Sequence, residues 1–183
     1  MDSKLSILSA NCQGLRDINK RKDVFNYFKS KNHNIYCLQD THFTQEIHKE
    51  VRSMWGYECH FSSVRSNSRG TAILINNNFE YKLIQEKTDP RGNYLILHLE
   101  CNSRNLIIVS IYAPNEDKPE FFENIFSKID NIGSDYPLII CGDFNLVIDP
   151  SIDYSNYLNI NNPRARNKLL EIIENKGLIE IYI

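Results

Sequence analysis

Several features that mark specialised classes of proteins are absent from this sequence. No apolar run approaches the roughly 20 residues that a membrane-spanning helix needs. Residues 1–5 carry one lysine and lead into only a very short apolar stretch, which is not the pattern of a signal peptide. We therefore expect an intracellular protein that has no membrane partner.

Paired cysteines are also absent. The five cysteines are odd in number, include no Cys-x-x-Cys spacing and lie mostly inside strand-like runs. This pattern argues against a disulfide framework and against a structural zinc site. We expect reduced, half-buried cysteines, in agreement with an intracellular location.

The chain has no excess of positive charge. Its formal net charge is −2, so it lacks the overall basic footprint of many nucleic-acid binders. Local basic groups occur at residues 20–22, at Arg65 with Arg69, and at residues 164–168, and a solvated charged face is the preferred explanation of each. A bound metal would supply part of the missing positive charge if the partner were a phosphodiester. Composition therefore neither requires nor excludes DNA.

What the chain does contain is the composition of one ordinary globular domain. It has 183 residues, of which 42% are hydrophobic and 24% are charged, and a chain of this length can bury a core without covalent staples. No internal repeat, low-complexity tract or linker divides it. We therefore treat residues 1–183 as a single domain.

Four short apolar runs each end on carboxylate or carboxamide groups. The runs are residues 5–9, 35–38, 106–111 and 138–140, and the polar residues that follow are Asn11, Gln39 with Asp40, Asn115, and Asp143 with Asn145. Such runs are typical of buried strands, and strand ends at one edge of a sheet are where α/β proteins build their sites. Clustered oxygen ligands of this kind suit Mg²⁺.

The spacing of apolar residues predicts the fold class. It indicates helices over residues 18–31, 44–55, 118–132 and 167–176, and further strands over 57–62, 71–75, 79–85 and 94–99. Thr44 is the expected N-cap of the second helix. Because residues 57–112 lack helices, a doubly wound parallel sheet is excluded. We predict an α/β fold, a four-layer α/β/β/α sandwich of two mixed sheets with outer helices.

Each candidate residue, taken alone, also has an ordinary structural explanation. Asp143 and Asn145 lie two residues apart and share one side of an extended segment, but both are equally typical of a turn. Asp40 is either a metal ligand or a helix cap. The alternatives for the others are a turn at Asn11 or Asn115 and a core position for Tyr112.

Taken together and in order, these segments resemble one superfamily. Ser9-Ala10-Asn11, Leu38-Gln39-Asp40-Thr41, residues 111–115 and residues 142–145 resemble the endonuclease/exonuclease/phosphatase superfamily. Within it, residues 39–42, 69–75 and 111–115 are most similar to the endonuclease domain of non-LTR retrotransposons, as is the segment 153–166. The resemblance covers the whole chain.

The resemblance implies a set of roles. Asp40 would bind the metal, Mg²⁺ or Mn²⁺, with Asn11 beside it. Asp143 would position or deprotonate the attacking water, and Asn145 would orient that residue and touch the phosphate. Such a site would hydrolyse phosphodiesters, because a metal and amide donors neutralise the charge that builds on the phosphate oxygens.

The remaining roles concern the substrate. Tyr112 and Asn115 would contact the scissile phosphate and support the site. The implied partner is DNA, which the enzyme would nick, acting in the nucleus, and no obligate protein partner is evident. A phosphomonoesterase of the same superfamily and an inactive gene remnant are the alternatives.

Two departures from the family pattern affect this expectation. The metal-binding acid is usually Glu, whereas Asp40 is one methylene shorter, which we interpret as a tuning difference. The family also ends with a Ser-Asp-His motif, but this chain contains no Asp-His dipeptide, and its five histidines all precede Asn115. We therefore expect a domain that is incomplete at the C-terminus, lacks the last strands of the second sheet and has impaired activity.

Overall fold

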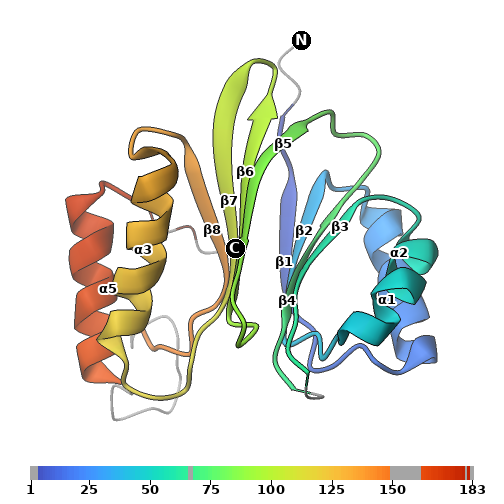
Figure 1. Cartoon of the computed structure of the whole chain (residues 1–183), viewed down its shortest axis with the longest axis horizontal. Helices are drawn as coiled ribbons and strands as arrows, with labels where there is room; N and C mark the ends of the chain where they lie inside the picture. Colours follow the sequence, from blue (N-terminus) through green and yellow to red (C-terminus); the bar gives the residue numbers. More distant parts are fainter. Residues whose placement is uncertain (1–3, 66–67, 149–161, 180, 182–183) are drawn as a thin grey trace. The chain divides into compact units, whose positions relative to one another are not determined.

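The structure, a computed structural model, describes residues 4–65, 68–148, 162–179 and 181 (Figure 1). The chain divides into two units: residues 1–112 with 135–143 form the first, and residues 113–134 with 144–183 form the second. Most of the segment 153–166 that resembles retrotransposon domains lies outside the described residues, as do three residues of the apolar run 179–183.

Sheet A belongs to the first unit and has the strand order β1-β2-β4-β3. Its strands are β1 (Ile7–Asn11), β2 (Ile35–Gln39), β4 (Thr71–Ile75) and β3 (Cys59–Ser62). β1 and β2 are parallel and place Asn11 opposite Gln39, while β4 is antiparallel to both β2 and β3. β2 and β4 are buried throughout. Both faces of these strands are covered, which explains why their sequences are almost continuous apolar runs.

Sheet B belongs to the same unit and has the order β5-β6-β7-β8. Its strands are β5 (Lys82–Thr88), β6 (Tyr94–Cys101), β7 (Arg104–Tyr112) and β8 (Leu138–Asp143). The first three pair in antiparallel fashion, whereas β7 and β8 are parallel and place Tyr112 opposite Asp143. Both sheets are therefore mixed, as predicted.

The core of the first unit has two layers. Between the sheets, alternate residues of β2 and β4 pack against alternate residues of β6 with Ile108 of β7, as the two-residue period of a strand requires. The opposite face of sheet A packs against α1 (Ile18–Lys31) and α2 (His48–Trp55) (Figure 1). In this layer the Trp55 ring lies edge-on to Phe25 and Tyr36. The helices on this face hold sheet A in place from outside.

The second unit contains α3 (Pro119–Gly133) and α5 (Pro163–Asn175), which pack against each other. Asp117 accepts the backbone N–H groups of Arg164 and Ala165 at 3.3 and 2.7 Å. This carboxylate satisfies N–H groups in the first turn of α5, which has no cap from its own Asn162. An ion pair between Lys176 and Asp130 joins the other end of the two helices.

The predicted α/β sandwich of two mixed sheets is confirmed, and three details of the prediction are wrong. The Thr44 side chain accepts no capping hydrogen bond; a 3₁₀ turn, η1 (Gln45–Ile47), follows it and α2 starts at His48. The strand predicted at 79–85 lies at 82–88, because Phe79 closes a turn onto Asn76. The last helix begins at Pro163 rather than residue 167, since proline is favoured at a first helical position.

One finding bears on membranes. Within the described ranges, no helix has the length and apolar character that crossing a bilayer requires.

Candidate functional site

The first unit brings four of the predicted residues to strand ends. β1 ends at Asn11 and β2 is followed by Asp40 in sheet A, while β7 ends at Tyr112 and β8 at Asp143 in sheet B. Because parallel neighbours end at the same edge, each parallel pair delivers two of these residues together. The strand ends are therefore the framework of the candidate site.

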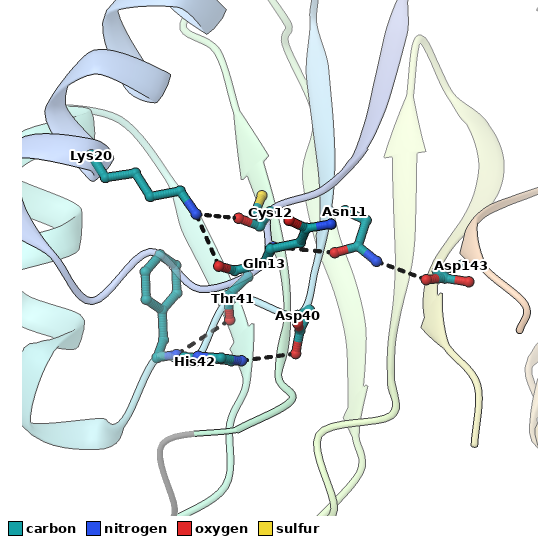
Figure 2. Close-up of polar contacts among 9 residues, drawn as sticks. Asn11, Cys12, Gln13, Lys20, Asp40, Thr41, His42 and Asp143 are labelled. Carbon is teal, nitrogen blue, oxygen red and sulfur yellow. Dashed lines mark hydrogen bonds and ion pairs between the residues drawn. The ribbon is translucent and has the colours of Figure 1, made fainter. Parts of the chain in front are cut away.

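A hydrogen bond between Asn11 and Asp143 joins the two sheets at this edge. The Asn11 Nδ2 donates to Asp143 Oδ2 at 2.7 Å, and the Asn11 Oδ1 accepts the backbone N–H of Gln13 at 3.2 Å (Figure 2). Lys20 Nζ donates to the carbonyls of Cys12 and Gln13, both at 2.9 Å, which holds the loop after β1. In this arrangement Asn11 orients the carboxylate of Asp143, whereas its predicted role as a metal ligand stays a prediction.

Gly142 sets the position of Asp143. The backbone of Gly142 has φ +151°, and a Cβ at this position would lie 2.0 Å from the carbonyl oxygen of Ile111. Only glycine permits β8 to approach β7 this closely. As a result Asp143 is the last residue of its strand and sits directly opposite Tyr112.

Asn93 fixes the backbone of Tyr112. The Asn93 side chain is buried, and its Nδ2 donates to the Tyr112 carbonyl at 2.8 Å, while the Tyr112 N–H donates to the Asn93 carbonyl at 2.7 Å. This two-way bond joins the β5–β6 connection to the end of β7. The position of the phenol therefore depends on a residue that the sequence indicated only as part of a hairpin turn.

Tyr112 lies within the electrostatic field of both acids. Burial raises the pKa of its phenol, and the negative charges of Asp40 and Asp143 raise this pKa further. The positive charge of Arg69 acts in the opposite direction. The phenol is thus a neutral hydrogen-bond donor at physiological pH, and its pKa depends on two carboxylates and a guanidinium.

Asp40 lies in a loop with an unusual backbone. It follows β2 with φ 51°, in the left-handed region, and His42 has φ 57°. The Asp40 Oδ1 lies 3.0 Å from His42 Nε2, and the carboxylate side chain is only 17% exposed. A carboxylate with one ring partner and limited exposure is positioned before any ligand arrives.

Gln39, the last residue of β2, is a buried polar residue that links the two sheets. It is 1% exposed, and the two N–H groups of its Nε2 share three acceptors, the Ser9 Oγ at 3.2 Å, the Cys37 carbonyl at 3.0 Å and the Ser110 Oγ at 3.1 Å. Ser110 belongs to β7, so this amide connects sheet A to sheet B. A polar residue at the end of a buried apolar run was the available sequence signal for this connection.

Asn115 and Asn145 belong to the second unit and were predicted to contact phosphate. The Asn145 Nδ2 donates to the Ala113 carbonyl at 2.7 Å, and Asn162 Nδ2 donates to the carbonyls of Asn115 and Asn145 at 3.1 and 3.4 Å. These bonds hold the segments after β7 and β8 together within the unit. The predicted roles of Asn115 and Asn145 toward phosphate stay predictions.

Sequence reasoning gave no specific role to Arg69 and His42. Arg69 was grouped with Arg65 as a solvated charged face, and Arg65 is indeed exposed, but Arg69 is half-buried and influences the Tyr112 phenol. His42 was noted only within a motif. The signal for both is local: each residue has a positive φ without being glycine, and such residues often cluster at functional sites.

The donor set fits a hard divalent cation. The residues that the structure describes contain no group of three His, Cys, Asp or Glu side chains placed to hold a metal. Mg²⁺ does not need such a cage, because it is usually held by one or two carboxylates and completes its shell with water and substrate phosphate. Asp40 and Asp143, near one phenol, are carboxylates of this kind.

Comparison with known proteins agrees with this chemistry. A model of the family described as Endonuclease/Exonuclease/phosphatase matches residues 8–166. The chain is 26% identical over 184 residues to the transposon TX1 uncharacterized 149 kDa protein of Xenopus laevis, covering 97% of this chain and 14% of that protein. It is also 26% identical over 167 residues to an exodeoxyribonuclease of Bacillus subtilis (strain 168), covering 83% of this chain and 62% of that protein.

A solved structure has the same fold. The endonuclease domain of TRAS1, a telomere-specific non-LTR retrotransposon, matches with a TM-score of 0.65 and 16% sequence identity, covering 95% of this chain and 71% of that chain. At this identity the likeness concerns the fold alone. The chain spans less than two thirds of the length of both sequence relatives, at 14% and 62%.

Proposed function

The chain belongs to the Endonuclease/Exonuclease/phosphatase family, whose members are hydrolases, and on this basis we propose that it is the endonuclease domain of a retrotransposon-type mobile element. In this proposal it hydrolyses phosphodiester bonds in DNA and requires Mg²⁺ or Mn²⁺. The observation that carries the proposal is the hydrogen bond of Asn11 with Asp143 beside a phenol, Tyr112, that both Asp143 and Asp40 influence.

The substrate class is inferred from the relatives. One similar protein is a transposon protein, another is an exodeoxyribonuclease, and a structure of the same fold is a retrotransposon endonuclease domain. A mobile element must cut DNA in order to insert, so a nicking activity in the nucleus is the natural use of such a domain. These likenesses support DNA over a small phosphomonoester as the substrate.

We assign the water-activating role to Asp143. Its carboxylate accepts the Asn11 amide through Oδ2, which fixes the direction of the carboxylate. Asp143 would take a proton from the attacking water while the water oxygen forms a bond to phosphorus. One ester P–O bond would break, and the leaving oxygen would gain a proton and depart as an alcohol. General base catalysis of this kind accelerates the reaction by roughly 10²–10⁴-fold.

Asp40 is the residue that would hold the metal, and Tyr112 would donate a hydrogen bond to a non-bridging phosphate oxygen. When bound, the cation neutralises charge on the phosphate oxygens. Arg69, whose positive charge reaches the phenol, would add to this neutralisation. Asn115 and Asn145 keep the phosphate-binding roles that the family resemblance gives them.

Nicking of supercoiled plasmid tests the proposal. Because the 183 residues contain no Asp-His dipeptide, and loss of one charge-stabilising group costs roughly 10²–10³ in rate, we expect nicking only slightly above background. This weak activity should require Mg²⁺ or Mn²⁺. Because it is weak, incubations must be long and the enzyme in excess. The matched control is Asp143→Ala, in which it should disappear.

Two outcomes contradict the proposal. Equal nicking by the original chain and Asp143→Ala would remove Asp143 from the chemistry. Hydrolysis of a phosphomonoester such as p-nitrophenyl phosphate at a rate above plasmid nicking would identify the chain as a phosphatase instead.

A further inference from the structure

The loop that carries Asp40 has a backbone that is held from two sides. On one side the N–H groups of Gly14 and Leu15 donate to the carbonyls of Asp40 and Thr41 at 2.7 and 2.8 Å. On the other side the N–H of His42 donates to the Arg69 carbonyl at 2.8 Å. Since left-handed backbone at non-glycine residues persists only where the surroundings fix it, these bonds define the path of residues 40–42.

A fixed backbone does not by itself orient the Asp40 carboxylate. The side chain still rotates about its own bonds, and an aspartate has few atoms with which to reach a cation. His42 removes this freedom, because its Nε2 lies 3.0 Å from the Asp40 Oδ1. The two side chains are 17% and 30% exposed, so the contact is partly shielded from competing water.

Gly14 in turn confines the ring of His42. A Cβ on Gly14 would lie 2.8 Å from the His42 Nδ1 and 3.2 Å from its Cε1. The imidazole therefore lies directly against the Cα of Gly14, in the loop that follows Asn11 at the end of β1. Figure 2 shows the ring reaching across to Asp40 beside this loop.

We propose that His42 is a positioning residue that aims the Asp40 carboxylate at the metal, and that Gly14 supplies the space in which the ring does so. The proposal rests on the proposed function, since it assumes that Asp40 binds a divalent cation. Asp40 is one methylene shorter than the glutamate that the resemblance leads one to expect. A shorter side chain has fewer conformations in which its carboxylate reaches the cation, so the orientation of that carboxylate matters more. The histidine makes up for the shorter acid by fixing that direction.

Three variants separate aiming from packing. His42→Phe keeps a ring over Gly14 but removes the donor, and His42→Gln keeps a nitrogen donor near the position of Nε2 without the ring. Gly14→Ala leaves His42 intact and pushes its ring away. Gly56→Ala is the control for the last change, because Gly56 also has a positive φ, +87°, but nothing lies within 4 Å of a Cβ there.

The measurement is Mn²⁺ affinity at fixed pH, from the electron paramagnetic resonance signal of free Mn²⁺, with the melting temperature of each metal-free protein recorded alongside. We expect His42→Phe and Gly14→Ala to weaken Mn²⁺ binding about 10–100-fold, the usual effect of losing a partner that orients a metal ligand. His42→Gln should recover most of the affinity. Gly56→Ala should lower the melting temperature without weakening Mn²⁺ binding.

Several results overturn the inference. The first two are an unchanged Mn²⁺ affinity in His42→Phe and equal losses of Mn²⁺ affinity in His42→Gln and His42→Phe. The third is a loss of Mn²⁺ affinity in Gly56→Ala as large as in Gly14→Ala. The fourth is no Mn²⁺ binding by the original chain at millimolar concentration. Weaker binding in His42→Phe with no plasmid nicking by any protein would uphold the inference and count against the endonuclease proposal. Nicking that depends on metal, with unchanged affinity in His42→Phe, would do the reverse.

Discussion

The two parallel strand pairs of the first unit deliver their acids in different ways. Asp143 is the last residue of β8, paired in register with Tyr112 across β7. Asp40 lies one residue beyond β2, in a left-handed loop conformation, with its carboxylate against His42. One acid is therefore fixed by the sheet itself and the other by side-chain and loop contacts, so the two should respond to different kinds of change.

The largest expected effect follows from the acid that the sheet fixes. Gly142→Ala places a Cβ 2.0 Å from the Ile111 carbonyl oxygen, so β7 and β8 must separate. We expect a loss of stability on the order of 4 kcal/mol or more, at the upper end for single substitutions, measured by urea unfolding. Gly56→Ala, where the added Cβ meets nothing, should cost only about 1–2 kcal/mol, and equal losses would contradict the assigned cause.

The next effect separates the chemical roles of the two acids. Asp40→Ala should abolish Mg²⁺ or Mn²⁺ binding, measured by calorimetry, because its carboxylate is the proposed ligand. Asp143→Ala should retain most of the metal affinity, while its weak nicking activity should fall to background because the proposed general base is lost. Metal binding that survives in Asp40→Ala and is lost in Asp143→Ala would exchange the two assignments.

A smaller effect tests what the two pairs share. Ser110→Ala removes the hydroxyl through which β7 meets the Gln39 amide of β2. Because Gln39 keeps its bonds to Ser9 and Cys37, we expect destabilisation of only about 1–2 kcal/mol. Thermal or urea unfolding measures it, and a larger loss would show that this single contact dominates the joining of the sheets.

The smallest effect compares the acids through Tyr112. Both charges raise the pKa of the phenol, and that of Asp40 raises it more than that of Asp143. Because the charge of Asp40 makes the larger contribution, we expect Asp40→Asn to lower the pKa of Tyr112 more than Asp143→Asn does. Carbon-13 NMR of labelled tyrosine, assigned with Tyr112→Phe, provides the measurement, and the opposite order would place the phenol nearer to Asp143.

The same raised pKa has a consequence for stability. A phenol whose pKa is higher in the folded protein contributes stability that is fully present below the pKa of an unfolded tyrosine and is lost as the pH rises through the folded value. Unfolding free energy should therefore decline at alkaline pH, and Tyr112→Phe should make that decline shallower. A decline of the same steepness in both proteins would assign it to other groups.

The fold was predictable wherever one face of an element is buried. α1 and β4 have the predicted bounds, because strong apolar spacing and clear turn residues define them. β5 was shifted by three residues, since an exposed edge strand carries little pattern from burial. The start of α5 was missed because its N–H groups are satisfied by Asp117, a residue far away in sequence.

The site was predictable as a set of strand ends but not as a set of contacts. The rule that sites form at the ends of strands selected Asp40 and Asp143, whose charges both act on the Tyr112 phenol, while the roles of these residues stay predictions. It did not foresee that the Asn11 amide faces Asp143, or that His42 contacts Asp40. Both depend on loop backbone geometry and on sheet-to-sheet packing, which local sequence patterns do not encode.

The Gln39 contact also constrains how this chain can change over generations. If the chain is part of a mobile element, as proposed, its copies accumulate substitutions, and most surface positions tolerate them. Positions 9, 39 and 110 do not change independently, because a buried amide without partners is costly and Gln39 relies on hydroxyl groups from both neighbours. Among copies that still fold, these three positions should change as a group, so that their joint variation identifies which copies remained under selection.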